Sequence, residues 1–431
     1  MSALARYFVK RGTLVCGYDK TRTNLTIALE NEGIAINYLD DEAALPLSFQ
    51  ENLKDTLIIY TPAIPKDSAI LNYFKVNGFV FKKRSEVLGI ISRGQFCIAV
   101  AGTHGKTTTS SIIAHLLTDS GYGCTAFLGG IATNYNSNFL IGDNNVVVVE
   151  ADEYDRSFLT LNPDISVITS MDADHLDIYG DAAQLHESFH LFAGQLKPGG
   201  TLFVKKDLPI EGIPYGLNEA AVVGKNIRVL GSCFMFDFQS EGIEIKDLSL
   251  MLPGKHNVEN AVAAIAVALK LGIAPEEIKK AVATFKGVKR RFEYILKTPA
   301  HIYIDDYAHH PEELRACFDA VRQLYPDKKL TVLFQPHLFT RTRDFAEDFA
   351  EVLSTADDLV LLEIYPAREL PLEGITSQWL LDKITLNNKS LTKKEGVLEI
   401  IKNKQPELLL TVGAGDIDTL IQPLKQLLNH A

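Results

Sequence analysis

The sequence has few cysteines, and their spacing excludes the sites that cysteines most often form. Only 5 occur in 431 residues, with no C-x-x-C pair: Cys16, Cys97, Cys124, Cys233 and Cys317. Disulfide frameworks are dense in small secreted chains, and cysteine zinc sites use closely spaced pairs. We therefore expect neither kind of site, and the reducing cytoplasm is the expected compartment.

Long hydrophobic runs are also absent. The longest, such as Val146–Val149 and Leu408–Val412, have the length of a β-strand, far below the roughly 20 residues that cross a bilayer. Arg6, Lys10 and Arg11 interrupt the start of the chain before the apolar core of a signal peptide forms. The sequence predicts neither a membrane span nor a secretory leader.

Basic residues are outnumbered, since 43 Lys and Arg against 54 Asp and Glu give a formal net charge of −11. Nucleic acid and anionic membranes attract basic surfaces, so neither is an expected partner. The 46% hydrophobic and 23% charged residues are typical of a globular protein. A chain of this length is expected to form about three domains.

Short β-branched runs alternate with amphipathic helical segments, a pattern typical of α/β layers around parallel sheets. After a first helix over Met1–Gly12, strands are expected at Thr13–Tyr18, Leu57–Tyr60, Phe96–Ala101, Val146–Val149, Asp164–Ser170, Ile302–Ile304, Leu330–Phe334, Asp358–Leu362 and Leu408–Val412. The sequence therefore predicts an α/β fold with largely parallel sheets.

A glycine-containing loop follows the strand Phe96–Ala101. It reads Gly102-Thr103-His104-Gly105-Lys106-Thr107-Thr108 and precedes apolar residues at helical spacing. Backbone N–H groups of such a loop and the helix N-terminus favour phosphate, the lysine adds a mobile charge, and the threonine hydroxyl suits Mg²⁺. Val100 replaces the first glycine of the strict P-loop pattern, so the alternative is an ordinary tight turn.

Acidic residues follow two of the expected strands. Glu150 comes directly after Val146–Val149, and His175 lies in an acidic run after Asp164–Ser170. Because parallel strands bring their carboxyl ends to one edge of a sheet, both side chains are candidates for an Mg²⁺ site with Thr107. The alternative is that these acidic runs are solvated loop ends.

The sequence resembles the Mur ligases, ATP-dependent amide-forming enzymes of peptidoglycan precursor synthesis. The matching segments span nearly the whole chain, and those from Gly287 onward resemble the branch that adds the first amino acid. The segments are AGTHGKTTT (Ala101–Thr109), VEADEYDRSF (Val149–Phe158), DADHLDIYG (Asp172–Gly180), GKHNVENAVAA (Gly254–Ala264), GVKRRFE (Gly287–Glu293), DDYAHHP (Asp305–Pro311), QPHLFTRTRDF (Gln335–Phe345), YPARELPLEGITS (Tyr365–Ser377) and TVGAGDID (Thr411–Asp418).

This resemblance implies three domains: a Rossmann-like UDP-sugar domain at 1–93, a P-loop-type ATPase domain at 94–292 and a Rossmann-like C-terminal domain at 293–431. It implies that L-alanine is joined to the lactyl carboxylate of UDP-N-acetylmuramate through an acyl phosphate, giving ADP and phosphate. The chain is then expected to act on small molecules, as a monomer or weak homodimer.

The resemblance also assigns roles to individual residues. Lys106 would hold the β- and γ-phosphates of ATP, Thr107 and Glu150 one Mg²⁺ and His175 a second, with Mn²⁺ as a substitute. The implied ATP contacts are Gly102, Thr103, His104, Gly105, Lys106, Thr107, Thr108, Asn257 (adenine), Arg291 (phosphates) and Asp306 (ribose). Taken singly, each is better explained by structure: Asn257 as a helix N-cap, Arg290-Arg291 as a solvated pair at a linker, and His309-His310-Pro311 as a turn and helix start. Their joint occurrence inside the matched segments favours the functional roles.

For the amino-acid substrate the resemblance points to Tyr307, His309, His337 and Arg341. Arg341 suits the α-carboxylate, through a forked contact. The family commonly has an arginine directly after the QPH histidine, where this chain has Leu338. Alanine remains the expected substrate, with glycine and serine as alternatives for a small pocket.

The family usually opens with a strand and a loop resembling GIGGIGMSALA, and this chain begins at the Met-Ser-Ala-Leu-Ala of that loop. The loop cradles the diphosphate of the UDP-sugar. The expectations are an upstream start codon, weak UDP-sugar binding and an unpaired sheet edge. Asp19, Thr61 and Ala63 are the remaining candidates for contact with the UDP-sugar.

Three other functions stay open at this point. The first is the recycling ligase that attaches a murein tripeptide to the same UDP-sugar and shares the EADEYD run. The second is a P-loop kinase or ATP-driven switch without ligase activity, which leaves DDYAHHP and QPH without a role. The third is a truncated ATP-binding protein with little ligase activity.

Overall fold

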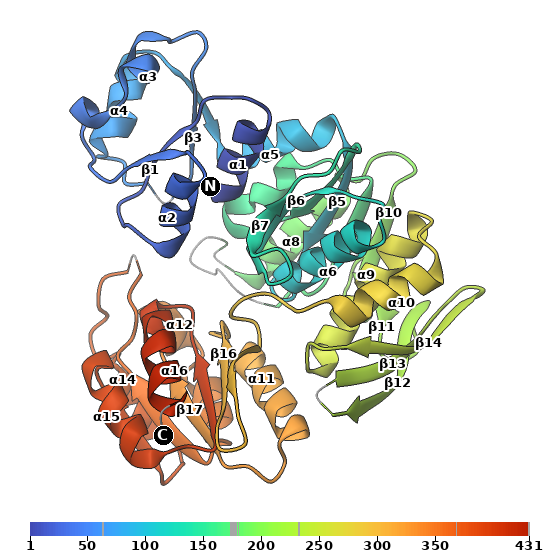
Figure 1. Ribbon diagram of the computed structural model, residues 1–431, viewed down its shortest axis with the longest axis vertical. Coiled ribbons are helices and arrows are strands. Elements are labelled where there is room, and N and C mark those ends of the chain that lie inside the picture. The colour runs from blue at the N-terminus through green and yellow to red at the C-terminus, as the bar shows by residue number, and fades with distance from the viewer. Residues whose placement is uncertain (63, 173–178, 180, 232, 368, 430–431) are drawn as a thin grey trace. The chain divides into compact units, whose positions relative to one another are not determined.

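The computed structural model describes residues 1–431 except 63, 173–178, 180, 232, 368 and 430–431 (Figure 1). Two compact units divide the chain. The first comprises Met1–Val223, Gln239–Ile243 and Asn260–Ala281, and the second comprises Gly224–Phe238, Glu244–Glu259 and Val282–Ala431. No helix in the described ranges combines the length and hydropathy that crossing a bilayer requires.

The N-terminal part of the first unit contains two small parallel sheets, one of β1 with β2 and one of β3 with β4. In the described part of the chain, β1 and β3 each pair with one strand only, so each small sheet leaves a strand edge without a hydrogen-bonded neighbour. The elements are α1 (Ser2–Lys10), β1 (Cys16–Tyr18), α2 (Asn24–Asn31), β2 (Ala35–Asn37), η1 (Glu42–Ala44), α3 (Leu47–Glu51), β3 (Leu57–Tyr60), α4 (Ala69–Val76), β4 (Val80–Lys83) and α5 (Arg84–Arg93).

The larger sheet of the first unit has the order β11-β10-β9-β5-β8-β6-β7, parallel except for β7. Its elements are β5 (Phe96–Ala101), α6 (Lys106–Asp119), β6 (Thr125–Ala132), β7 (Ser137–Leu140), β8 (Val146–Glu150), η2 (Tyr154–Thr160), β9 (Ile165–Ile168), α8 (Ala182–Ala193), β10 (Thr201–Lys205) and β11 (Ile213–Gly216). The first residues of β12 (Val222–Leu230) pair with β11.

Burial explains why β5 is the central strand. Cys97 to Ala101 are 0% exposed, and the neighbouring β8 and β9 consist almost entirely of buried Val and Ile residues. A continuous apolar run of this kind is typical of a parallel strand covered on both faces. Helix α6 packs against β5, β6 and β8 (Figure 1). The carboxyl ends of β5, β8 and β9 therefore lie side by side at one edge of the sheet.

The second unit contains a sheet of order β15-β16-β20-β17-β18-β19, parallel except for the edge strand β15. Its elements are β15 (Glu293–Lys297), β16 (Ile302–Asp306), α11 (Pro311–Leu324), β17 (Leu330–Phe334), α12 (Phe339–Asp344), α13 (Ala346–Leu353), β18 (Asp358–Leu362), α14 (Ser377–Lys383), β19 (Lys389–Thr392), α15 (Lys394–Lys404), β20 (Leu408–Val412), η3 (Asp416–Leu420) and α16 (Ile421–Asn429). Strands β13 (Cys233–Ser240) and β14 (Ile243–Leu250) and helices α9 (Lys255–Lys270) and α10 (Pro275–Thr284) each have residues in both units.

Three sequence predictions are corrected by these bounds. The strand expected at Thr13–Tyr18 is only Cys16–Tyr18, and the one expected at Asp164–Ser170 is only Ile165–Ile168. Asn257 is not a helix N-cap, because α9 already begins at Lys255. In contrast, Pro311 does begin α11, as the sequence suggests for a proline at the first helical position.

Candidate functional site

The loop between β5 and α6 has the strand, loop and helix order expected of a phosphate site. Gly102 has φ +141°, and a Cβ on it would lie 2.1 Å from Thr169 Oγ1. Gly105 has φ +82°, and a Cβ there would lie 2.8 Å from Asn260 Oδ1. Only glycine fits both positions, because the backbone conformation is left-handed and the neighbours are too close for a side chain.

The residues after β9 hold this loop in shape. The His104 N–H donates to Ser170 Oγ at 2.7 Å, and the Asp172 N–H donates to Thr103 Oγ1 at 3.0 Å. These contacts engage the N–H group of His104 and the hydroxyl group of Thr103. The first N–H groups of α6 are left without intrahelical acceptors, as at every helix N-terminus, and this is where an anion is stabilised.

Lys106 is held by a buried acidic residue. Its Nζ donates to Glu153 Oε1 at 2.9 Å and to the carbonyl oxygen of Gly102 at 2.6 Å, while the Glu153 side chain is 1% exposed. Burial disfavours the ammonium, but the carboxylates of Glu153, Asp152 and Glu150 more than offset this and raise the pKa of Lys106. The lysine therefore stays charged beside the loop.

Thr107 and Glu150, the two predicted metal ligands on described elements, are in direct contact. The Thr107 hydroxyl donates to Glu150 Oε1 at 3.0 Å, and the Gly129 N–H donates to Glu150 Oε2 at 2.9 Å. A Cβ on Gly129 would lie 2.3 Å from Oε1, so glycine is required for this approach. The hydroxyl and carboxylate are hard oxygen donors that suit Mg²⁺.

The other residues of the first unit that were predicted to bind metal or the UDP-sugar are not placed in this site by the structure. The predicted ligand His175 and the UDP-sugar candidate Ala63 lie outside the described residues. Asp19 is exposed and accepts the Thr21 N–H at 3.0 Å, and Thr61 lies directly after β3. Within the described part of the chain, neither of these two residues is hydrogen-bonded to the phosphate-type loop, and their role remains a prediction.

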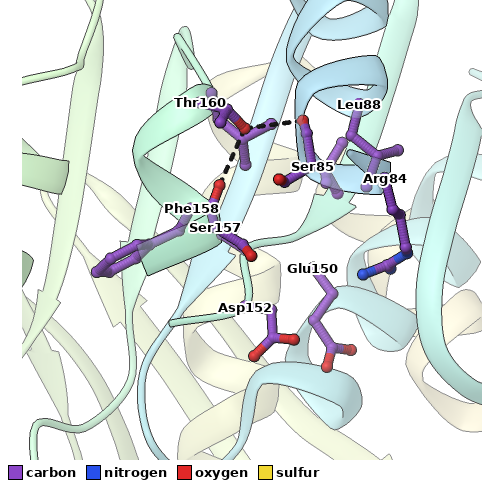
Figure 2. A pocket seen from close by; sticks show the side chains of 11 residues that line it. Arg84, Ser85, Leu88, Glu150, Asp152, Ser157, Phe158 and Thr160 are labelled. Atoms are coloured by element: carbon purple, nitrogen blue, oxygen red, sulfur yellow. Dashed lines mark hydrogen bonds between the residues drawn. The ribbon is translucent and has the colours of Figure 1, made fainter. Parts of the chain in front are cut away.

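A small hollow, open to solvent, lies beside Glu150, between the start of α5 and the end of β8 (Figure 2). It is lined by Arg84, Ser85, Leu88, Val149, Glu150, Ala151, Asp152, Ser157, Phe158, Thr160 and Leu161. The hollow shares Glu150 with the Thr107 contact, so a group bound in it lies next to the predicted metal site.

In the second unit, the four residues predicted for the amino-acid substrate form one cluster. The ring centroid of His309 lies 5.3 Å from that of Tyr307 and 5.8 Å from that of His337. Arg341 Nη1 is 3.3 Å from His337 Nδ1, and Arg341 is only 6% exposed. The Tyr365 ring stacks on His337 at 5.7 Å, a contact that the sequence did not indicate.

The predicted nucleotide contacts of this unit have partners of their own. Asp306 accepts the N–H groups of Phe292 and Ala308, each at 2.7 Å, and burial raises its pKa. Arg291 lies over the Tyr307 ring at 5.2 Å. The Asn257 side chain donates to the carbonyl oxygen of Pro253. Their roles toward ATP stay predictions.

We expect Asp305 to make the stability of the second unit depend on pH. Burial raises the pKa of Asp305 from 3.8 to about 6, although Arg290 Nε lies 2.9 Å from its Oδ2 and acts in the opposite direction. The folded state therefore binds this proton more tightly than the unfolded state. Its stabilising effect is complete below about pH 4 and is lost as the pH rises to about 6.

Between pH 4 and pH 7 the loss of this stabilising effect lowers the free energy of unfolding by about 3 kcal/mol, at about 1.4 kcal/mol per pKa unit. We expect urea unfolding at pH 4 and pH 7 to show a larger fall in the free energy of unfolding for the wild type than for Asp305→Asn. The same pH dependence in both proteins would exclude Asp305 as its source.

Two functional features were missed from sequence. Glu153 stands in the same acidic run as Glu150 and Asp152, but nothing in the sequence of the run distinguishes the buried carboxylate from these two half-buried ones. Gly129 is part of a Gly129-Gly130 pair inside β6, where a strand glycine signals close backbone approach. That signal was available in the sequence.

Models of known domain families match three successive parts of the chain. "Mur ligase family, catalytic domain" matches residues 1–96, "Mur ligase middle domain" 100–268, and "Mur ligase, glutamate ligase domain" 290–415. Two curated relatives are UDP-N-acetylmuramate–L-alanine ligases. That of Flavobacterium psychrophilum is 51% identical over 100% of this chain and 96% of its own length, and that of Christiangramia forsetii is 50% identical over 100% and 95%.

A solved structure of similar fold is the UDP-N-acetylmuramate-alanine ligase of Thermotoga maritima. Its TM-score is 0.84 at 25% identity, and the match covers 100% of this chain and 97% of that one. The predicted α/β fold with N-terminal, central and C-terminal parts of this type is thereby confirmed.

Proposed function

We propose the reaction of this chain from the premise that the chain belongs to the Mur ligase family. It is an ATP-dependent enzyme that joins L-alanine to the carboxylate of UDP-N-acetylmuramate in peptidoglycan precursor synthesis. The observation that carries this conclusion is the 50% identity to the alanine ligase of C. forsetii over the full length of this chain. The murein tripeptide ligase becomes the second candidate.

The chemistry follows from the poor reactivity of a carboxylate toward amines. A carboxylate oxygen attacks the γ-phosphorus of ATP, the bond to the β-phosphate oxygen breaks, and ADP leaves. The amine nitrogen of alanine then attacks the carbonyl carbon of the acyl phosphate, and the carbon–oxygen bond to phosphate breaks, releasing phosphate and the amide. The protein's part is to position reactants and offset negative charge.

For ATP, we assign the β- and γ-phosphates to Lys106 and to the loop from Gly102 to Thr108, including Thr103, His104 and Gly105. The support is the charged lysine at the start of α6, where N–H groups without helical acceptors meet an anion. For the rest of the nucleotide, we assign adenine to Asn257, further phosphate contacts to Arg291 and the ribose to Asp306.

We assign Mg²⁺ to Thr107 and Glu150, because their oxygens are 3.0 Å apart at the carboxyl edge of β8. His175 remains the proposed ligand of a second ion, and Mn²⁺ a substitute. When bound, the metal would neutralise charge on the phosphates. Thr107 and Glu150 supply the donors, and Gly129 fixes the orientation of the carboxylate.

For alanine, we assign the α-carboxylate to Arg341, beside His337, His309 and Tyr307. A buried guanidinium binds a carboxylate through two parallel hydrogen bonds, which fixes its orientation. Leu338, at φ +71°, directly precedes α12, so the position after His337 offers no charged side chain to the α-carboxylate.

Phosphate release with ATP and UDP-N-acetylmuramate tests the proposal. We expect a higher kcat/KM with L-alanine than with glycine, serine or the tripeptide L-Ala-D-Glu-meso-diaminopimelate, and we expect the amide product by mass spectrometry. Preference for the tripeptide would favour the recycling ligase. A phosphorylated product without an amide would favour a kinase.

Gly129→Ala tests the metal assignment. The new methyl group would lie 2.3 Å from Glu150 Oε1, so the carboxylate must turn away from Thr107. We expect Mn²⁺ binding in the presence of nucleotide, followed by electron paramagnetic resonance, to weaken by about 10-fold or more, as for other changes that misorient a ligand. Gly94→Ala is the control, since a Cβ there would meet nothing nearer than 4.0 Å. Equal Mn²⁺ affinity in both variants would contradict the assignment.

A further inference from the structure

The hollow beside Glu150 has closely packed walls. Helix α5 approaches η2 so closely that a Cβ on Gly89 would lie 2.5 Å from the carbonyl oxygen of Thr160. The Thr160 hydroxyl donates to the carbonyl oxygen of Ser85 at 2.8 Å and to that of Ser157 at 2.9 Å. Phe158, at the base, stacks on Phe192 at 5.0 Å in the core. The hollow is therefore a preformed feature of the first unit.

The two sides of the hollow differ in charge. Figure 2 shows the carboxyl groups of Glu150 and Asp152 on one side and the Arg84 guanidinium turned toward the same space from α5. Arg84 makes no hydrogen bond or ion pair with any residue that the structure describes. The hydroxyl groups of Ser85 and Ser157, which also line the hollow, make none either.

This arrangement selects an anion on the α5 side. The Arg84 guanidinium can only donate hydrogen bonds, and the two serine hydroxyl groups can rotate to donate. The carboxylates of the opposite wall repel negative charge. Glu150 is already oriented toward Thr107 and Gly129 by two hydrogen bonds, so it is not the evident partner of Arg84. Among the described residues, the half-buried Arg84 guanidinium is therefore left to water or to a bound anion.

We propose that Arg84 binds the reacting carboxylate of the sugar nucleotide in this hollow. The inference rests on the proposed function, because it takes the carboxylate-bearing substrate from there. The geometry that supports it is the juxtaposition of an unpaired guanidinium with Glu150, the residue beside the phosphate-type loop. A carboxylate held here lies next to the place where the γ-phosphate is expected.

The charge balance of the reaction gives Arg84 a specific task. A carboxylate that attacks the γ-phosphate must approach another anion, and this approach is repelled in a site with little water. Lys106 and the metal ligands act on the phosphate side. Arg84 acts on the carboxylate side, where a planar fork can hold one oxygen while the other points at phosphorus.

Calorimetric binding of two sugar nucleotides, without ATP, tests this inference. UDP-N-acetylglucosamine shares the uridine, the diphosphate and the amino sugar with UDP-N-acetylmuramate but lacks the lactyl carboxylate. We expect Arg84→Gln to weaken binding of UDP-N-acetylmuramate by about 10- to 100-fold, the usual cost of lost charge-assisted hydrogen bonds. Binding of UDP-N-acetylglucosamine should stay unchanged, and Arg84→Lys should recover part of the loss.

Arg93→Gln is the matched control, because Arg93 is an exposed residue at the other end of the same helix. Unchanged binding of UDP-N-acetylmuramate by Arg84→Gln, while the wild type binds it and releases phosphate, would overturn this inference alone. Equal weakening for both sugar nucleotides would also overturn it, since it would place Arg84 on the shared diphosphate. A wild type that binds UDP-N-acetylmuramate but forms no amide with L-alanine would overturn the proposed function instead.

Discussion

Lys106→Met, made in a Glu153→Gln background, is expected to lower alanine-dependent phosphate release by about 10²- to 10³-fold relative to Glu153→Gln alone. This is the usual cost of removing one preorganised charge that stabilises developing negative charge. The ammonium lies at the start of α6, and phosphate oxygens gain charge there as the γ-phosphate is transferred. We expect most of the loss in kcat rather than in the KM for ATP.

The background mutation is needed because Glu153 is 1% exposed. Removing only the lysine would leave a buried carboxylate without its ion pair, at a cost of about 3–5 kcal/mol in stability. The neutral glutamine avoids that cost, so loss of activity can be separated from loss of fold by circular dichroism.

Lys197→Met provides a matched control in the same unit. Lys197 Nζ also pairs with a carboxylate, Asp164, at 2.8 Å, but Asp164 directly precedes β9, at the opposite edge of the sheet. Activity close to that of the wild type is expected for this control, because the Lys197–Asp164 pair lies away from the loop. A Lys106 variant that retains the activity of its background would contradict the role of this lysine in phosphoryl transfer.

Strand positions were the most predictable part of the fold. The runs at Phe96–Ala101, Leu330–Phe334, Asp358–Leu362 and Leu408–Val412 become strands with these same bounds. Each is a short apolar run buried on both faces of a parallel sheet, so the hydrophobic pattern and the fold impose the same limits. The edge strand β1 was less predictable, because little of it is buried.

The candidate site was predictable where local sequence determines geometry. A glycine at φ +82° before Lys106 and a hydroxyl one residue later belong to a single turn, so their proximity follows from the chain itself. The contact of Thr107 with Glu150 also follows, because two adjacent parallel strands end at one edge. In contrast, the pairing of Lys106 with Glu153 depends on which carboxylate of an acidic run turns into the core. In the structure Glu153 is the buried residue of the run, and the Tyr179 hydroxyl donates to its carbonyl oxygen.

Arg341→Lys is expected to raise the KM for L-alanine by about 10- to 100-fold, with a smaller effect on the KM for ATP. Lysine keeps the charge but lacks the planar fork that holds both carboxylate oxygens. The loss of this charge-assisted hydrogen bonding weakens alanine binding by about 1.5–3 kcal/mol. Because Arg341 is 6% exposed, water cannot readily replace the lost hydrogen bonds. Steady-state phosphate release with varied alanine measures the change.

Arg343→Lys is the control for this substitution, since Arg343 lies on the same helix α12 but is half-exposed and pairs with Asp344. Its KM for alanine should equal that of the wild type. If Arg341→Lys instead raised the KM for all three substrates equally, the residue would support the fold of the second unit rather than the amino acid. An isolated effect on alanine is the expected outcome, because His337, whose Nδ1 lies 3.3 Å from Arg341 Nη1, cannot replace the paired donors of the guanidinium.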